Sequence, residues 1–284
     1  MGVTILRPQF LYATMNIEIA EIPPKKELAP YVQTYWYGRF NLNQSRFFTQ
    51  QVMPNGFVEL IFHLSSKHCY LYQRSRWSQS PVFTLIGLFT KPYEVQFDEC
   101  VKTFGIRFKP EGIYNLFGVP ASEFSEDFLD MTCVLSRSFA TFSQRILEQS
   151  DVNIMKSLAD EYLLANLVRN NINYYYLNRA AEVIRNTNGM IRMDELIDNV
   201  YISHRQLERE FKDKIGITPK QYIRIARLNA VNRHLLKTDT ADLISLSYEN
   251  GFYDHAHLIR EFKYFSGLAP SKFLKRASSY IVNV

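Results

Sequence analysis

The chain contains few cysteines and no long apolar run. Three cysteines occur among its 284 residues, namely Cys69, Cys100 and Cys133, and they are far apart and odd in number. That spacing indicates neither a disulfide framework nor a Cys-x-x-Cys metal motif. No uninterrupted apolar segment approaches the roughly 20 residues that a membrane-spanning helix requires, and the N-terminus lacks a basic stretch followed by an apolar one. We therefore expect no signal peptide, no membrane partner and a cytoplasmic location.

The common motifs of catalysis and metal binding are also missing. No glycine-rich phosphate loop and no Ser/His/Asp pattern occur. The best candidate metal ligands are His63, His68 and Cys69, but they lack the close histidine pair with a carboxylate that a metal site needs. We therefore expect no catalytic residues, no metal and no cofactor, and a protein that is not an enzyme.

Charge is unevenly distributed along the chain. The net charge is +5, with 33 Lys and Arg against 28 Asp and Glu. Residues 1–173 hold 16 of each sign, whereas residues 174–284 hold 17 basic and 12 acidic side chains. The whole excess lies in the C-terminal part, as expected if that part contacts phosphates. The alternative is ordinary surface charge.

The first part of the chain has the pattern of short strands. Segments 57–64, 82–87, 93–97 and 102–108 are apolar and rich in β-branched and aromatic residues. Asn55-Gly56 before the first of them predicts a tight hairpin turn. Regular spacing with Gly and Pro breaks favours an antiparallel sandwich or small barrel, so we expect a β-rich domain over 1–130.

Apolar residues then recur at helical spacing. Two amphipathic helices are expected between 131 and 173, ending in a linker at 170–173. They could form a dimer seam through Phe142, Leu147, Leu158 and Leu163, or pack on their own β domain, because an apolar stripe looks the same in either role. Aromatic residues in such a pattern lie more often in the core than in a ligand pocket, but four of the first part are candidates for a pocket: Tyr35, Trp36, Phe62 and Phe89.

The C-terminal part contains an internal repeat. Leu207–Pro219 returns as Leu258–Pro270, with Leu, Arg, Glu, Phe, Lys, Gly and Pro each shifted by 51. Each copy predicts a short amphipathic helix that Gly ends, after which Pro opens the next helix. A repeat of this kind indicates one supersecondary unit used twice, here a helix-turn-helix. We expect a DNA-binding domain over 174–284.

The helix boundaries within each unit follow from capping residues. The first unit should contain a helix over about 193–199 and a second helix opened by Ser203, with Gln206 at the capping-box position. The second should contain a helix over 243–250 and another opened by Asp254. Thr218-Pro219 should open a long helix between the units, running to about 236. The alternative is a purely structural helical bundle.

Residues opposite the apolar stripes of the second helices should face outward. The N-terminal residues of such a helix meet base edges in the major groove, and arginine can donate two hydrogen bonds to guanine. The predicted DNA-facing residues are His204, Arg205, Glu208, Arg209 and Lys212 in the first unit, and His255, Ala256, Ile259, Arg260 and Lys263 in the second.

Segments 203–219, 227–230 and 251–270 resemble the AraC/XylS-type transcription regulators, whose signature covers about the last hundred residues. The resemblance implies seven helices, two helix-turn-helix units in adjacent major grooves, and an activator. It also implies double-stranded DNA, RNA polymerase, a small-molecule effector and a second copy of the chain as partners. Tyr201, Asn250 and Tyr253 depart from the family pattern, Tyr201 standing where a glycine is common.

Segments 28–37, 53–56, 87–92 and 105–112 are similar to the sensory domains that precede such DNA-binding domains. That similarity implies an α+β chain with a cupin-like β domain before the helical one. Two competing hypotheses remain at this stage. The chain could be a cupin-type enzyme carrying a helical module, or a scaffold whose helical half binds protein.

Overall fold

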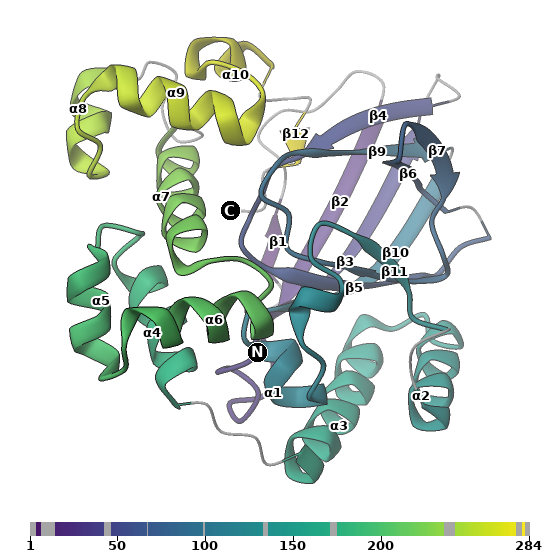
Figure 1. Cartoon of the computed structure of the whole chain (residues 1–284). Coiled ribbons are helices and arrows are strands. Elements are labelled where there is room, and N and C mark those ends of the chain that lie inside the picture. The colour runs from purple at the N-terminus through teal and green to yellow at the C-terminus, as the bar shows by residue number, and fades with distance from the viewer. Residues whose placement is uncertain are drawn as a thin grey trace.

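The computed structural model describes residues 4–6, 15–42, 47–66, 68–98, 100–132, 136–170, 175–235, 242–276 and 280–281. Strands dominate up to residue 130 and helices follow, so the expected α+β class is confirmed. Figure 1 shows the strands gathered on one side of the molecule and helices α4 to α10 on the other. None of the helices described is long and apolar enough to cross a membrane.

The strands form two sheets. The larger sheet contains, in spatial order, β1 (Thr4–Leu6), β2 (Met15–Ile22), β3 (Val32–Leu42), β10 (Cys100–Phe108), β5 (Val58–His63), β8 (Phe83–Ile86) and β11 (Phe128–Asp130). The smaller sheet contains β12 (Tyr280–Ile281), β4 (Phe47–Val52), β9 (Tyr93–Asp98), β6 (Tyr70–Gln73) and β7 (Arg76–Gln79). The four strands predicted from composition are therefore confirmed as β5, β8, β9 and β10.

The predicted Asn55-Gly56 hairpin is wrong. Gly56 does adopt a positive φ of 78°, but β4 pairs with β9 whereas β5 pairs with β10 and β8. The segment between β4 and β5 therefore crosses from one sheet to the other. A local turn signal shows that the chain bends, but it does not show which strand becomes the neighbour.

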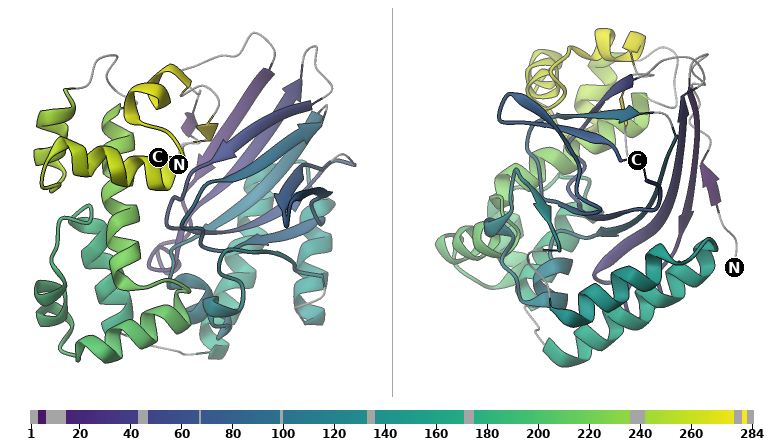
Figure 2. Two further views of the ribbon diagram at one scale, coloured as in Figure 1. Left: turned by 45° about the horizontal axis from the view of Figure 1, so that its top comes forward. Right: turned by 90° about the vertical axis from the view of Figure 1, so that its right-hand side faces the viewer.

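The two faces of the larger sheet have different surroundings. Trp36 lies opposite Gly105 on the face toward the smaller sheet, and a Cβ on Gly105 would come within 2.1 Å of the indole. Glycine is required there because the ring occupies the space of a side chain. The other face carries Tyr35 and Phe62, and α2 (Arg137–Leu147) and α3 (Val152–Asn170) cover it. Figure 2 shows these two helices side by side against the strands.

Helices α2 and α3 pack on their own β-rich part. Phe142, Leu158 and Leu163 are buried, and Phe142 stacks on Tyr162 with ring centroids 4.3 Å apart. These residues fill the core of the chain and are not available as a dimer seam, which is the alternative that the stripe pattern left open. Residues 171–173 of the linker expected at 170–173 lie outside the described residues.

Seven helices follow among the described residues after 174, the number that the family resemblance implied. They are α4 (Tyr175–Asn186), α5 (Met193–Val200), α6 (His204–Lys214), α7 (Pro219–Leu235), α8 (Leu243–Glu249), α9 (His255–Ser266) and α10 (Pro270–Arg276). In Figure 1, α7 runs between a group formed by α4 to α6 and a group formed by α8 to α10. This part of the chain also contains one short strand, β12, which pairs in parallel with β4.

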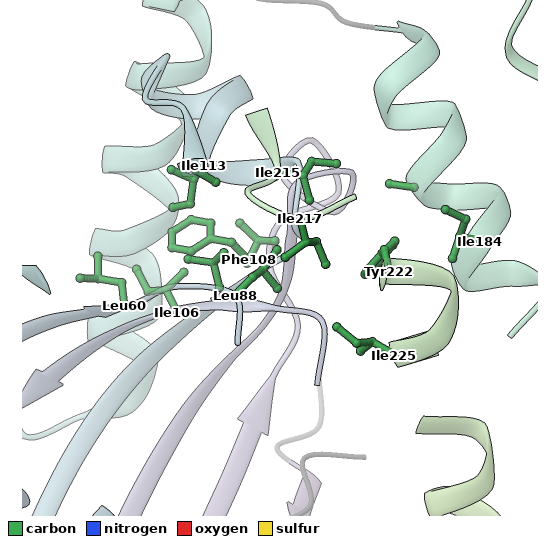
Figure 3. Packing of buried hydrophobic residues seen from close by; sticks show 14 of the residues in the cluster. Leu60, Leu88, Ile106, Phe108, Ile113, Ile184, Ile215, Ile217, Tyr222 and Ile225 are labelled. Atoms are coloured by element: carbon green, nitrogen blue, oxygen red, sulfur yellow. The ribbon is translucent and has the colours of Figure 1, made fainter. Parts of the chain in front are cut away.

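One apolar core joins the β-rich part to the helices. It includes Leu60 and Phe108 of the larger sheet, Ile113 of α1 (Gly112–Phe117), and Ile215 and Ile217 between α6 and α7. Figure 3 shows these side chains in one continuous cluster. A polar contact reinforces the junction, because Arg185 of α4 donates to both oxygens of the buried Glu111 carboxylate, at 2.6 and 2.9 Å.

Candidate nucleic-acid interface

The first helix-turn-helix unit consists of α5, a three-residue turn and α6. Tyr201 ends α5 in the left-handed region, with φ 55° and ψ 38°. Ser203 then caps α6 by accepting a hydrogen bond from the backbone N–H of Gln206 at 3.2 Å. Leu207 and Phe211 are fully buried. Cap and anchors together fix the rotation of α6 about its own axis, and so determine which residues face outward.

The outward face of α6 carries the predicted residues. His204, Arg205, Arg209 and Lys212 are exposed, and Glu208 is half-buried. The His204 Nε2 lies 3.8 Å from the Glu208 carboxylate, at the edge of an ion pair. Arg205 has no hydrogen bond or ion pair with any residue that the structure describes, so its guanidinium is available to a ligand.

Arg209 has an internal partner. Its Nη2 donates to Glu210 at 3.0 Å while the side chain stays 73% exposed. Lys214 also binds Glu210, and this hydrogen bond lowers the pKa of the Glu210 carboxyl below its ordinary value. Glu210 therefore stays ionised and holds Lys214 in the junction with the β-rich part, whereas Arg209 can exchange this partner for DNA at small cost.

The second unit repeats this construction with α8 and α9. Asp242 caps α8, and Asp254 caps α9 by accepting from the His257 N–H at 2.6 Å. Leu258 and Phe262 are fully buried. His255, Arg260 and Lys263 are exposed, and Ala256 and Ile259 are half-buried on the same outward face.

His257 belongs to the turn of this second unit. Its ring lies 5.5 Å from that of Phe252, and its Nδ1 accepts from the Tyr253 N–H at 3.4 Å. This histidine therefore supports the turn before α9.

Helix α7 holds the two units at a fixed separation. Arg227 donates to the Gly189 carbonyl, which precedes α5, and to the Gly251 carbonyl, which precedes α9, at 2.9 and 3.1 Å. Its guanidinium also lies 5.4 Å from the Phe252 ring centroid. One side chain thus ties the segment between α4 and α5 to the turn between α8 and α9.

Sequence reasoning missed two glutamates that stabilise the units. Glu210 and Glu261 occupy equivalent positions of the repeat, 51 residues apart. Glu210 binds Lys214, and Glu261 accepts two hydrogen bonds from Arg224 of α7 at 2.6 and 3.0 Å. The repeat could have revealed these residues, because a glutamate occurs at the same position of both copies although DNA-binding helices favour basic side chains.

The four aromatic candidates for a pocket do not face one space. Tyr35 and Phe62 lie in the closed core beneath α2 and α3, where the Tyr35 hydroxyl donates to Asp160 at 2.8 Å. Trp36 lies between the two sheets, and no described residue hydrogen-bonds its buried indole N–H. Phe89 lines a shallow cavity at the end of the smaller sheet, next to Tyr93.

His63, His68 and Cys69 do lie together between the sheets. The imidazole rings of His63 and His68 stack with centroids 4.9 Å apart, and the Cys69 Sγ lies 3.8 Å from the His63 Nε2. Among the described residues, no group of three such side chains is arranged to hold a metal ion. Burial lowers the pKa of His63 to about 3 and raises that of Cys69 to about 11, so both are neutral near pH 7.

The nearby serine does not complete a catalytic triad. Ser80 Oγ lies 2.8 Å from the His63 Nε2, but the other ring nitrogen has no partner within the described part of the chain. A carboxylate at that nitrogen is what orients a catalytic histidine. The cluster is therefore a buried polar contact between the sheets.

Two family models match the chain. Residues 196–276 match a model described as "Helix-turn-helix domain", and residues 20–130 match a "Domain of unknown function (DUF6597)". The first model begins within α5 and runs to the end of α10, so it spans both units.

Three individual proteins are similar over parts or most of the chain. The HTH-type transcriptional activator RhaS of Escherichia coli O1:K1 / APEC is 34% identical over 73 residues, which is 26% of this chain and 26% of RhaS. The match therefore spans about a quarter of that relative. The Msm operon regulatory protein of Streptococcus mutans serotype c is 25% identical over 124 residues, 43% of this chain and 44% of that protein.

Among solved structures, ToxT from Vibrio cholerae aligns with 92% of this chain and 98% of its own, at 13% identity and a TM-score of 0.47.

The repeat, the two capped helices and the helix-turn-helix match all concern the same residues. The chain carries a C-terminal double helix-turn-helix domain of the AraC/XylS type.

Proposed function

We propose that this chain is a sequence-specific transcription regulator that binds double-stranded DNA through the first turns of α6 and α9. One observation carries the proposal: each unit presents an exposed arginine, Arg205 or Arg260, that has no partner among the described residues. The capped and anchored helix orients each arginine side chain, and no described carboxylate neutralises its charge. Such a side chain suits bidentate recognition of guanine in the major groove.

The remaining outward residues have chemistry that suits base edges. Arg209 can also reach guanine, Glu208 can accept from a cytosine amine, and Ile259 can offer an apolar contact to a thymine methyl. His204, His255 and Ala256 complete the two reading faces. The spacing that Arg227 maintains supports contact with two DNA segments about one helical turn apart.

Lysines beside the reading faces supply the sequence-independent part of the affinity. Lys212, Lys263 and Lys272 are exposed on α6, α9 and α10. Each lysine that neutralises a phosphate releases condensed counterions, which favours binding at low salt.

The β-rich part, about residues 1–130, controls the DNA-binding part in this proposal. It has no net charge to add to DNA affinity, but it contacts α4, α6 and α7 directly. A small molecule or a partner protein that shifts this junction would shift the units, and the activator name of RhaS favours activation, by way of RNA polymerase, over repression.

Self-association is part of the same proposal, with residues 131–173 as the contact. Because Phe142 and Leu163 are buried within the chain, that contact would use the outer surface of α3, where Ile154 is 45% exposed. Two copies would present four units and gain avidity on repeated half-sites. Sedimentation of the full chain, with and without DNA, measures this directly.

The salt dependence of DNA binding tests the proposal. For the full chain on a random-sequence duplex, the logarithm of affinity should fall linearly with that of salt concentration, with a slope steeper than about −2.7 if the three lysines each contribute about −0.9. Lys212→Ala should reduce the slope by about 0.9, whereas Lys102→Ala, an exposed lysine on β10, should leave it unchanged. A slope near zero would favour a cupin-type enzyme or a protein-binding scaffold instead.

A further inference from the structure

An apolar cavity of about 140 Å³ lies on the helix-facing side of the larger sheet. Leu60, Leu85 and Leu129, from three neighbouring strands, form one side of it. The other lining residues come from α1, from the segment that leads to β11 and from the position just after β11: Ile113, Phe117, Val119, Glu123, Phe124 and Met131. Glu123 is the one ionisable residue of this lining, and it is exposed.

The cavity opens to solvent at the exposed Glu123, and Phe117, Val119 and Leu129 of its lining are half-buried, whereas the remaining lining residues are buried. Protein interiors are as dense as organic crystals and voids larger than one water molecule are few, so an apolar space of this size is uncommon. A cavity that offers no polar partners does not hold ordered water, and a cavity of about 150 Å³ lined by Leu, Ile and Phe side chains in another protein binds benzene. The chemistry of this lining therefore selects a neutral apolar molecule of about that size.

The backbone holds one wall of the cavity in place. Gly87, at the end of β8, accommodates the Phe124 carbonyl oxygen, which would lie only 1.9 Å from a Cβ at that position. Two backbone hydrogen bonds of 3.0 Å, from Gly87 to Asp127 and from Glu126 to Leu88, pin the same segment to the sheet. Collapse of the cavity would break these contacts, so the space is built into the fold.

The segment that forms this wall of the cavity also contacts α6, the helix proposed to bind DNA, on its other side. The short 3-10 helix η1 (Ala121–Glu123) packs against the end of α6, where a Cβ on Gly216 would lie 3.0 Å from the Ala121 carbonyl oxygen. Ser122 Oγ donates to Asp213 at 3.5 Å, and Lys214 Nζ lies 5.3 Å from the Tyr114 ring of α1. Figure 3 shows Ile113 of the cavity wall close to Ile215 and Ile217.

We propose that this cavity binds a neutral apolar molecule of about the size of benzene, and that its occupancy changes DNA affinity by moving η1 and α1 against α6. The second clause rests on the proposed DNA-binding function; the first does not. A single layer of chain, from Ile113 to Glu123, separates the cavity from α6, so a small outward displacement of that layer reaches the reading helix without an intermediate element.

Binding is tested on the full chain with benzene as the probe. Benzene should raise the thermal unfolding midpoint in a concentration-dependent way, because a ligand of the folded state stabilises it by mass action. Val119→Phe, which places a ring in the cavity, should abolish the shift, and Leu129→Phe serves the same purpose if the first variant does not fold. Ser78→Phe, which adds a ring on the fully exposed strand β7 away from the cavity, should keep the shift. An absent shift in the wild type, or an equal shift in the filled variants, would overturn the proposal.

Coupling is measured in the same samples by titrating a preferred DNA duplex with and without saturating benzene. We expect a change in DNA affinity of about fivefold or more in the wild type and in Ser78→Phe, within the usual range of allosteric coupling, and none in Val119→Phe. Unchanged DNA affinity despite benzene binding would overturn the coupling. Failure to bind DNA even without benzene would instead overturn the proposed function and leave the cavity as a ligand site.

Discussion

At the scale of single residues, Tyr201 stands in a backbone conformation that L side chains avoid. It ends α5 in the left-handed region and its side chain is 92% exposed. The left-handed conformation costs a non-glycine residue about 1–2 kcal/mol. A glycine avoids this cost, but it loses more backbone entropy on folding, which reduces its advantage by roughly 0.5–1 kcal/mol. Because the Tyr201 ring is exposed, it buries almost no apolar surface that could offset the cost of this backbone conformation.

Replacement of Tyr201 by glycine should therefore raise the free energy of unfolding by about 0.5–1 kcal/mol. Urea denaturation of the full chain measures this as a higher midpoint with an unchanged slope. Tyr253→Gly is the matched control, because Tyr253 is 85% exposed before α9 but is not among the residues with positive φ. If both variants respond alike, the conformation of Tyr201 is not the cause.

His63 should make stability depend on pH. Burial, then the neighbouring His68, lowers its pKa from 6.5 to about 3 in the folded chain. Between these values the unfolded state binds a proton that the folded state does not, so stability falls as pH falls below 6.5. The loss approaches about 1.4 kcal/mol per pH unit.

His63→Leu should remove this contribution. Between pH 7.5 and pH 5, the wild type should lose about 2 kcal/mol more than the variant, since carboxylates common to both cancel in the comparison. Urea denaturation at the two pH values gives the difference. Equal losses in both proteins would show that His63 titrates normally in the folded chain.

At the scale of elements, the helices of both units could be predicted because their signals are local. Ser203 and Asp254 each cap a helix with their own side chains, and the expected helices over 193–199 and 243–250 correspond to α5 and α8 within one residue. Strand pairing could not be predicted in the same way. Asn55-Gly56 predicts a turn, but whether β4 pairs with β5 depends on contacts far along the chain.

Arg227 should be the residue that most affects the spacing of the two elements that read DNA. Arg227→Ala removes charged hydrogen bonds to Gly189 and Gly251 and should lower the free energy of unfolding by about 2–4 kcal/mol. It should also weaken contacts at both DNA segments together. Arg179→Ala, which breaks an exposed pair with Glu182 on α4, should cost about 0.5 kcal/mol or less. Similar effects of the two substitutions would contradict the bracing role of Arg227.

At the scale of the whole molecule, sequence reasoning separated a β-rich part from a basic helical part but did not join them. The Glu111 to Arg185 ion pair and the packing of Ile215 on Ile113 bring together residues that no local pattern relates. Likewise, the stripe on α2 and α3 could not show whether Phe142 faces a second chain or its own sheet. Both questions depend on tertiary packing, which periodicity alone does not encode.

The central claim is that two similar units read two DNA segments through Arg205 and Arg260. Selection of bound fragments from random DNA by the full chain tests it most directly. The account predicts two short base preferences about 10–11 base pairs apart. Arg205→Ala should relax the preference at one segment and Arg260→Ala at the other, each at a cost of about 1–3 kcal/mol. Selection without any enriched sequence, or a uniform loss of affinity in both variants, would contradict it.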